Sequence, residues 1–339
     1  MNVTVFPNLL ASADNNNPYI QDFIQSLNRT ENIKVINAPH KNPLKSLLYT
    51  KNQGDCFIFH WIETTPERPH GILQTITAIL LIIYLRLIGK KIVWFLHNKE
   101  PHSPRYYKLE KGMMKFMAHI SHLIVTHSKE GIKVAQELTP KAVRKTVFMH
   151  HPTKNRMGIT TPNPVKKYQL LIWGSISKYK GVLEFVRFVE EHPFKQPVSI
   201  MMIGKCGSSE LAESITQHLP ENITWLKESP SFDELKTYID AAQFVLIPYL
   251  SDSVLSSGLL MDSLSYGAKV IGPDTGSFKD YASEKQLGVY VFNDLSEIES
   301  IIENAQNDKK EFDYPDFLNR NNWEAFAKQL IELINKKLN

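Results

Sequence analysis

The residue run with the clearest chemical signal is Ser256, Ser257 and Gly258, late in the chain. A short apolar run at residues 244–248, typical of a buried parallel strand, leads into a polar loop. Gly258 then begins a helix that we expect to end near Gly267, a suitable C-terminal cap. Free N–H groups and the dipole at a helix N-terminus attract anions, so this segment predicts an anion site.

A second loop of the same kind lies earlier, in LLIWGSISKYKG at residues 170–181. A strand at 170–173 runs into Gly174 and a polar turn, and Lys180 precedes the helix predicted at 182–191. A lysine at the end of such a turn can supply a cation to a bound anion. Ser175 can donate a hydrogen bond there but carries no charge.

Histidines and other polar side chains follow two predicted strands in the first half, FIFHWIE and VWFLHNKEPH. Carboxyl ends of parallel strands share one edge of a sheet, so these side chains can converge. Histidine is suited to proton transfer near neutral pH, and Glu63 or Glu100 could serve as well. A zinc site and buried structural histidines are the alternatives, although the spacing fits no standard zinc motif. The set is His60, Trp61, His97, Asn98, Glu100 and His102.

A basic stripe follows His102. Ser103 is expected to cap a helix whose first residue is Pro104, and four basic residues then recur at a helical spacing. Such a helix can lie on an anionic membrane, or it can pack its apolar side on the core with its lysines in water. The basic residues are Arg105, Lys108, Lys111 and Lys115.

The elements that position these residues alternate between strands and helices in both halves. Expected first-half strands lie at 3–6, 33–36, 56–59, 92–96, 123–126 and 146–149. Apolar strands alternating with helices predict parallel sheets covered on both faces. The proline-containing stretch 153–167 reads as a linker, and residues 322–339 form an amphipathic helix. The apolar stretch 72–88 is interrupted by polar residues, so we expect a core helix instead of a membrane span.

The second half resembles the nucleotide-sugar half of GT-B glycosyltransferases, and glycosyltransferase family 4 in particular. That family has Gly-Arg-x-x-x-x-Lys-Gly at the first loop, where this chain matches at Gly174, Lys180 and Gly181 and has Ser175 in place of arginine. Two glutamates often follow eight residues apart, where this chain has Val254 and Asp262.

The resemblance implies two Rossmann-like domains facing a cleft. It predicts an acceptor domain at 1–152, a linker at 153–167, a donor domain at 168–321 and a C-terminal helix at 322–339 that crosses back to the first domain. It also implies metal-independent sugar transfer from a UDP- or GDP-sugar, with Asp262 on the ribose. The donor set it implies is Gly174, Ser175, Lys180, Tyr249, Ser256, Ser257, Gly258 and Asp262.

On the acceptor side, the resemblance to bacterial polysaccharide glycosyltransferases implies catalytic roles for His97 and Glu100. His60, Trp61, Asn98 and His102 would contact the acceptor, a hydroxyl of a glycan that is expected to be lipid-linked. No cofactor is expected. A sugar-nucleotide epimerase and a non-catalytic sugar-nucleotide-binding subunit remain the alternatives, the latter because the family arginine and first glutamate are missing.

Composition sets the remaining limits. The 339 residues, 42% hydrophobic and 22% charged, suit two globular domains. Cys56 and Cys206 are the only cysteines, which fits a reducing compartment and no disulfide framework. The N-terminus lacks the pattern of a signal peptide, so we expect a cytoplasmic protein.

Residues 1–152 carry 19 Lys and Arg against 10 Asp and Glu, which favours contact with an anionic membrane surface. No nucleic-acid motif appears.

Overall fold

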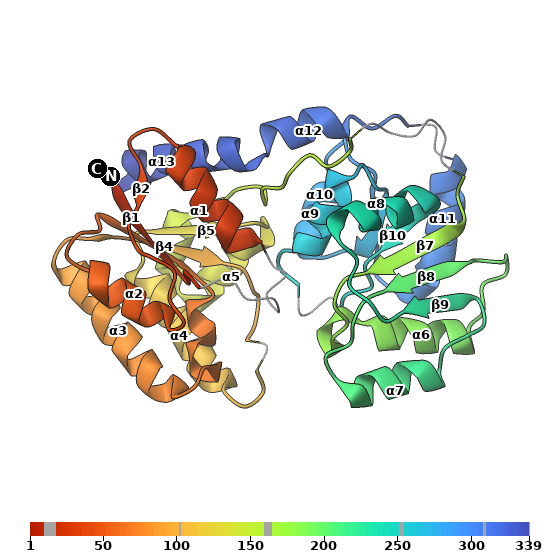
Figure 1. Ribbon diagram of the computed structural model, residues 1–339, viewed down its shortest axis with the longest axis horizontal. Helices are drawn as coiled ribbons and strands as arrows, with labels where there is room; N and C mark the ends of the chain where they lie inside the picture. Colours follow the sequence, from red (N-terminus) through yellow and green to blue (C-terminus); the bar gives the residue numbers. More distant parts are fainter. Residues whose placement is uncertain (10–17, 102, 159–164, 251–253, 308–309, 339) are drawn as a thin grey trace. The chain divides into compact units, whose positions relative to one another are not determined.

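The computed structural model describes residues 1–9, 18–101, 103–158, 165–250, 254–307 and 310–338 (Figure 1). The chain divides into two compact units. Unit 1 combines Met1–Pro152 with Asn321–Asn339, and unit 2 is Thr153–Arg320. The final helix therefore belongs to the first unit, as expected of a helix that crosses back.

Unit 1 is built on a parallel sheet of six strands in the order β2-β1-β3-β4-β5-β6. Strands with apolar residues on both sides are buried on both faces, and β3 and β5 are buried at every residue. All six strands expected in the first half are present. They are β1 (Asn2–Phe6), β2 (Lys34–Val35), β3 (Cys56–His60), β4 (Lys91–Leu96), β5 (Leu123–Thr126) and β6 (Thr146–Phe148).

Helices cover both faces of this sheet. Phe23 of α1 and Phe326 and Leu330 of α13 join one apolar cluster with Val93 and Val125 of the strands. On the opposite face lie α2, α3 and α4 (Figure 1). The helices of unit 1 are α1 (Tyr19–Arg29), α2 (Pro43–Thr50), η1 (Ile62–Glu67), α3 (Gly71–Leu87), α4 (Tyr107–Ile120), α5 (Glu130–Leu138), η2 (Pro140–Lys145) and α13 (Trp323–Leu338).

Two sequence expectations in unit 1 were wrong in part. The helix expected from Pro104 begins later, at Tyr107. Its first i to i−4 hydrogen bond runs from the Glu110 N–H to the carbonyl oxygen of Tyr106, which makes Tyr106 the N-cap. The apolar stretch at 72–88 does form a helix, α3, but it is not a core helix: only one side packs on the sheet, and the other is exposed. In the part of the chain that the structure describes, no helix is long and apolar enough to cross a membrane.

Unit 2 has a second parallel sheet, in the order β12-β11-β10-β7-β8-β9. Alternate residues of β7 face two separate apolar clusters, with Leu171 in one and Leu170 in the other. Its strands are β7 (Tyr168–Trp173), β8 (Ile200–Ile203), β9 (Ile223–Leu226), β10 (Ala242–Leu246), β11 (Val270–Pro273) and β12 (Val289–Phe292).

The helices of unit 2 cover both faces of that sheet as well (Figure 1). The sequence predicts α6 with its observed bounds, and α9 ends close to Gly267, whose φ of 78° is the left-handed conformation of a C-terminal cap. The helices are η3 (Lys178–Lys180), α6 (Val182–Glu191), α7 (Ser209–Gln217), α8 (Phe232–Ala241), α9 (Gly258–Ser265), α10 (Gly276–Ala282), η5 (Leu295–Glu297), α11 (Ile298–Asn307) and α12 (Tyr314–Arg320).

The packing of α13 gives a test of its place in unit 1. Leu330 is fully buried against strands and α1, so Leu330→Ala should lower the free energy of unfolding of unit 1 by about 2–5 kcal/mol through lost burial and a cavity. Lys328→Ala, on the exposed side of the same helix, is the matched control and should change it by less than about 0.5 kcal/mol. Urea unfolding measures both. Equal stability of the two variants would mean that α13 does not pack on this core.

Candidate functional sites at the carboxyl ends of the two sheets

In unit 2, two glycines shape the loop that follows β7. Gly174 has a φ of 95°, and a Cβ atom there would lie 2.7 Å from Leu259 Cδ1 on α9. Gly181 has a φ of 64°, and a Cβ atom there would lie 2.0 Å from the carbonyl oxygen of Pro248, just after β10. Both positions require glycine, because a side chain would be strained and would collide. The loop is thereby held against the start of α9 and the end of β10.

Lys180 is the buried cation of this loop. Its side chain is folded inward, and its Nζ donates hydrogen bonds to the carbonyl oxygen of Ser175 (2.6 Å) and to Ser175 Oγ (2.9 Å). The residue is only 9% exposed, and burial lowers the pKa of its ammonium group from 10.5 to about 8. Among the described residues no carboxylate forms an ion pair with it. An anion bound here would therefore stabilise the charged form of Lys180.

The start of α9 lies beside this loop. Ser257 caps the helix, with its Oγ accepting a hydrogen bond from the Leu260 N–H (3.1 Å), and Ser256 precedes it. Gly258, the first helical residue, is exposed, and a Cβ atom there would meet nothing within 4 Å among the described residues. The N-terminus of α9 is thus capped on its inner side and open at Gly258.

A small cavity joins several of the predicted donor residues. The loop after β7, the end of β10 and Leu259 of α9 all contribute to its wall. Predicted residues in its lining are Gly174, Ser175, Lys180 and Tyr249. The structure therefore brings these four together, next to the start of α9.

Asp262, the predicted ribose contact, lies in an ion pair. Its Oδ1 is 3.0 Å from Arg156 Nη1, which also donates to Ser265 Oγ at 2.9 Å. The Arg156 guanidinium stacks over the Phe232 ring, 4.3 Å from its centroid. These contacts tie the segment at Arg156 to α8 and α9. No local sequence pattern indicated this long-range partner, and the ribose role of Asp262 stays a prediction.

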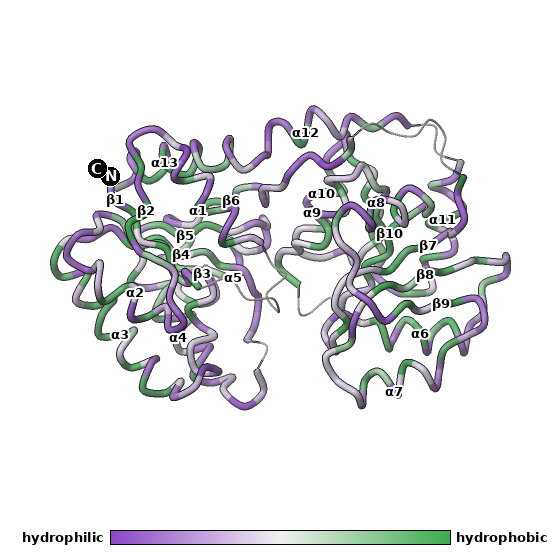
Figure 2. The backbone as a smooth tube through the Cα atoms, viewed as in Figure 1, coloured by the Kyte–Doolittle hydropathy of each residue, from purple (hydrophilic) through white to green (hydrophobic). Residues whose placement is uncertain are grey.

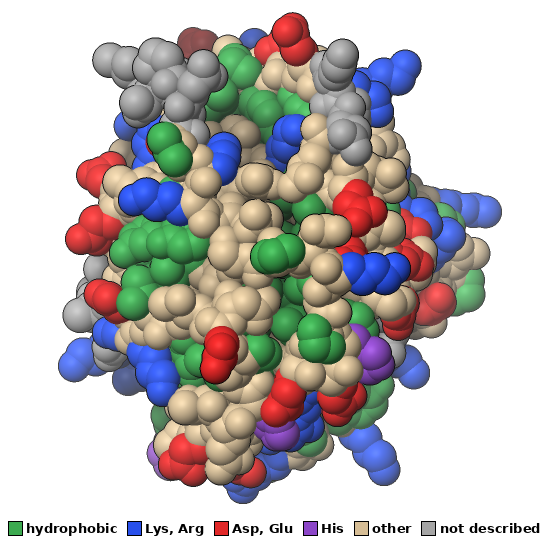
Figure 3. All heavy atoms as spheres, turned by 90° about the vertical axis from the view of Figure 1, so that its right-hand side faces the viewer, with side chains coloured by type: hydrophobic (Ala, Val, Ile, Leu, Met, Phe, Trp, Pro, Cys, Tyr) green, Lys and Arg blue, Asp and Glu red, His purple; other side chains and the backbone are tan. Residues whose placement is uncertain are grey.

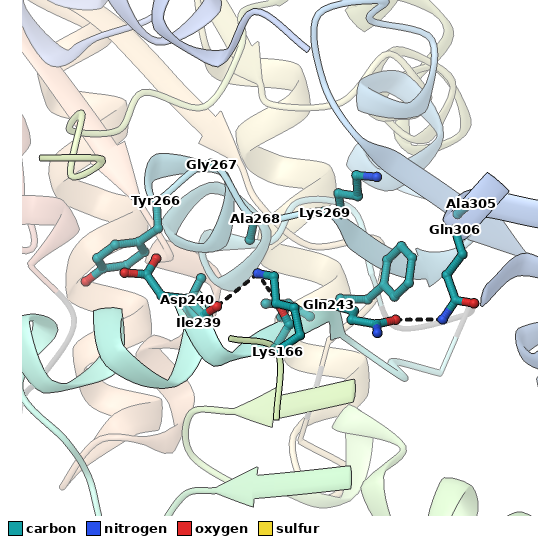
Figure 4. Close-up of a pocket in the computed structure, with 13 residues that line it drawn as sticks. Lys166, Ile239, Asp240, Gln243, Tyr266, Gly267, Ala268, Lys269, Ala305 and Gln306 are labelled. Atoms are coloured by element: carbon teal, nitrogen blue, oxygen red, sulfur yellow. Dashed lines mark hydrogen bonds between the residues drawn. The ribbon is translucent and has the colours of Figure 1, made fainter. Parts of the chain in front are cut away.

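A second cavity in unit 2 lies at the amino ends of β10 and β11 (Figure 4), and none of the predicted donor residues is in its lining. Lys166 Nζ donates to the carbonyl oxygens of Asp240 (2.9 Å) and Ala242 (2.7 Å), at the C-terminus of α8. Gln306 donates to Gln243 across the cavity (2.6 Å). A lysine at a helix C-terminus offsets the helix dipole, so these polar groups have a structural explanation.

In unit 1, histidines gather at the carboxyl ends of consecutive strands. His60 ends β3 and His97 follows β4, and their Nδ1 and Nε2 atoms are 3.0 Å apart. His127 follows β5 and His151 follows β6, with their rings 4.8 Å apart. Sequence reasoning found His60 and His97 but missed the other two, although both also follow strands and could have been found by the same rule.

Tyr19, at the start of α1, is the centre of this cluster. Its hydroxyl group is 2.8 Å from His127 Nε2, and its ring contacts those of His60, His97 and His151. His127 Nδ1 lies 3.0 Å from the carbonyl oxygen of Met149, the residue after β6, so Tyr19 and Met149 hold its ring from both sides. The buried Nε2 atom of His60 has no hydrogen-bond partner among the described residues.

Trp61 covers His97. The two rings stack with centroids 4.4 Å apart, and Trp61 has a φ of 46°, the left-handed conformation that is rare for a bulky residue. Such backbone conformations cost free energy and tend to occur at functional sites. Together, Trp61 and His97 form an aromatic surface at the edge of the sheet.

The other predicted acceptor-side residues have different surroundings. Glu100 accepts hydrogen bonds from Lys111 Nζ (2.5 Å) and the Tyr107 hydroxyl (2.7 Å), and these partners keep its pKa below the usual value despite partial burial. Asn98 is half-buried just after His97. His102 lies outside the described residues. The acceptor-side and catalytic roles of these residues stay predictions.

Of the predicted basic stripe, Lys111 on α4 is engaged by Glu100. Lys108 and Lys115 of α4 are exposed, and so is Arg105, which precedes the helix instead of lying on it. In the described ranges, no group of three or more His, Cys, Asp or Glu side chains is arranged to hold a metal ion.

Comparison with solved structures places this chain in the GT-B fold. No protein-family model matches it, and no curated protein matches it in sequence. Alr3699/HepE of Anabaena, solved with UDP and glucose, has a TM-score of 0.70 at 12% identity, covering 99% of this chain and 100% of that one. The lipopolysaccharide outer core galactosyltransferase WaaB has a TM-score of 0.68 at 13% identity and the same coverage. Sucrose-phosphate synthase from Thermosynechococcus elongatus has a TM-score of 0.68 at 11% identity, covering 99% and 98%.

The histidine cluster makes the stability of unit 1 depend on pH. Burial, with repulsion between neighbouring imidazoles, lowers the pKa values of His60, His97 and His127 well below 6.5, and burial lowers that of His151 to about 4. The unfolded chain takes up these protons first as the pH falls. The free energy of unfolding of unit 1 therefore falls as the pH drops below 6.5, by about 1.4 kcal/mol per pH unit for each histidine.

Two buried carboxyl groups act in the opposite direction. Burial raises the pKa values of Glu63 and Glu110 from 4.5 to about 7, so the folded state keeps protons that the unfolded chain releases. Their contribution to stability falls as the pH rises from 4.5 to 7. Because the two effects overlap, a single-residue variant is needed to separate them.

We expect His151→Gln to flatten the loss of stability between pH 6.5 and 5 by about 1.4 kcal/mol per pH unit relative to the unmodified protein. Native-state hydrogen exchange of the β4 amides reports the stability of unit 1 at each pH. His119→Gln, at an exposed position of α4, is the control for the substitution itself. An unchanged slope in His151→Gln would show that the His151 ring takes up its proton at the same pH in the folded and unfolded states.

Proposed function

We propose that this protein is a glycosyltransferase that moves a sugar from a nucleotide diphosphate donor, a UDP-sugar, to a hydroxyl group. The observation that carries the proposal is the buried Lys180 beside Ser175 and the open N-terminus of α9, at the carboxyl edge of the second sheet. Open α/β sheets bind ligands at that edge. HepE, which shares the fold, was solved with UDP and with UDP-glucose.

The donor end of the reaction needs a site that stabilises a diphosphate leaving group. Lys180 supplies one positive charge, and the first N–H groups of α9 supply fixed dipoles, in surroundings that exclude much of the water. Lys180 makes its present hydrogen bonds to neutral oxygens of Ser175. A phosphate oxygen in the place of one of them would add an ion pair to the hydrogen bond. These groups can stabilise the negative charge of the leaving diphosphate as a metal ion would, so we propose transfer without a bound metal.

The acceptor end is assigned to unit 1. Burial keeps His97 neutral at physiological pH, and a neutral imidazole can accept the proton of an attacking hydroxyl group. The stacked Trp61 offers the flat apolar surface on which a sugar ring can lie. We propose a hydroxyl of a lipid-linked glycan in surface polysaccharide assembly as the acceptor, supported by the name of WaaB, a lipopolysaccharide galactosyltransferase of the same fold.

Removing the cation tests the donor site. Lys180→Ala should weaken UDP binding and slow transfer by roughly one to three orders of magnitude, the cost of one charge-stabilising group. Titration calorimetry with UDP and initial rates with the UDP-sugar measure the two effects. Lys178→Ala, an exposed lysine of the same turn, is the matched control and should bind UDP normally. Normal affinity and turnover in Lys180→Ala would remove Lys180 from the site.

His97 is expected to act on the acceptor and not on the donor. His97→Gln should lower turnover at least about tenfold while changing UDP affinity less than about twofold. His97 is buried, so native-state hydrogen exchange of β4 must first show that unit 1 is folded in the variant. A folded variant that keeps full turnover but loses UDP binding would contradict the assignment.

Product analysis separates the three candidate functions. A transferase forms product only with the acceptor present, or releases sugar slowly by hydrolysis without it. An epimerase converts the UDP-sugar with no acceptor, and a binding subunit leaves the UDP-sugar unchanged while still binding it.

A further inference from the structure

Helix α3 carries a continuous apolar surface on the outside of unit 1. Figure 2 shows hydrophobic colouring along most of this helix, and it contains no acidic residue. The exposed large side chains on it and directly after it are Ile72 (59%), Leu73 (66%), Ile76 (51%), Leu80 (63%), Ile83 (37%), Tyr84 (39%), Leu87 (80%) and Ile88 (42%).

The opposite side of α3 is firmly packed. Ala78, Ile82 and Leu85 are buried at 1% exposure or less, and Thr75 Oγ1 donates to the Gly71 carbonyl oxygen within the helix. At the N-terminal end, a Cβ atom on Gly71 would lie 2.0 Å from the carbonyl oxygen of Pro66, so η1 and α3 are in close contact. The helix is part of the folded unit and presents its apolar side without unfolding.

A surface of this kind calls for a covering partner. Soluble monomers rarely expose large contiguous apolar patches, and those that occur mark protein or membrane interaction sites. The helix has 17 residues and is about 25 Å long at the usual rise. Its outward side is apolar along this length. By contrast, the side of unit 2 in Figure 3 shows acidic and basic side chains interspersed.

Basic side chains surround the C-terminal end of α3. Arg86 is the exposed charge on the helix, and the half-buried Lys90 and Lys91 follow it. Lys90 Nζ donates a hydrogen bond to the carbonyl oxygen of Asn52 at 3.4 Å. Lys145 Nζ donates to the carbonyl oxygens of His119 (2.7 Å) and Ser121 (2.6 Å). Burial, with repulsion from Arg86, lowers the pKa of Lys145 to about 8. Asp55 is an acidic residue at this edge, and its carboxylate accepts the N–H of Asn2 (2.7 Å).

We propose that the exposed side of α3 lies flat in the headgroup region of an anionic lipid bilayer, with Arg86 and Lys90 facing the lipid phosphates. An apolar helix face bordered by basic residues is the pattern of interfacial helices. Each basic residue near such a surface adds about fivefold to binding. A second copy of the chain is a poorer partner, because it would bring two basic surfaces together.

This inference does not depend on the proposed function, and its test has no activity readout. The protein should float with vesicles of phosphatidylcholine and phosphatidylglycerol, bind much less to phosphatidylcholine alone, and be released as salt rises. Leu73→Glu/Leu80→Glu should lower binding to the mixed vesicles at least about tenfold. Arg86→Glu/Lys90→Glu should remove the preference for phosphatidylglycerol.

Controls make each outcome decisive. Val165→Glu, in unit 2 at 79% exposure, should leave vesicle binding unchanged. Leu73→Gln/Leu80→Gln tests the loss of apolar surface without added charge, and circular dichroism and thermal unfolding check the fold of each variant.

Full vesicle binding by the folded Leu73→Glu/Leu80→Glu variant would overturn the proposal, as would loss of binding only in Lys108→Glu/Lys115→Glu on α4. A protein that ignores vesicles but sediments as a dimer, and becomes monomeric in Leu73→Glu/Leu80→Glu, would make this face a self-association surface and also overturn it.

Discussion

Both sheets of this protein are parallel and covered by helices on both faces, and this constraint decides where chemistry can occur. A side chain in the middle of such a strand is buried among apolar groups, where an uncompensated polar group costs several kcal/mol. Polar side chains therefore collect where the strands end. In unit 1 the strands end in His60, His97 and His127, and in unit 2 they lead to Lys180 and the capped start of α9.

Desolvation then adjusts the groups that collect there. It lowers the pKa values of the imidazoles of unit 1 well below 6.5, so the rings are neutral at physiological pH and each keeps one ring nitrogen that can accept a hydrogen bond. It also lowers the pKa of Lys180 to about 8, because its charge is costly when buried, and a bound anion would offset that cost. The same burial therefore disfavours charge at both edges, and of these groups only Lys180, whose pKa stays near 8, is still mostly charged at neutral pH.

Much of this arrangement could be predicted from local sequence. Apolar runs gave the strands, and the turn glycines with Lys180 gave the loop after β7, because those features depend on neighbouring residues. Tyr19 and Arg156 could not be found this way, since their partners His127 and Asp262 are 108 and 106 residues distant. The exposure of α3 was also out of reach, because a helix that is apolar all round does not indicate which side packs.

The central claim is that the loop after β7 and the start of α9 bind the diphosphate of a sugar nucleotide. Hydrogen exchange of the full chain with saturating UDP, compared with uridine, tests it most directly, because uridine lacks the diphosphate. The account predicts that UDP slows exchange at residues 174–181 and 256–260, and that uridine leaves those amides unchanged. Equal exchange with UDP and uridine at both segments, under conditions where calorimetry shows UDP bound, would contradict it.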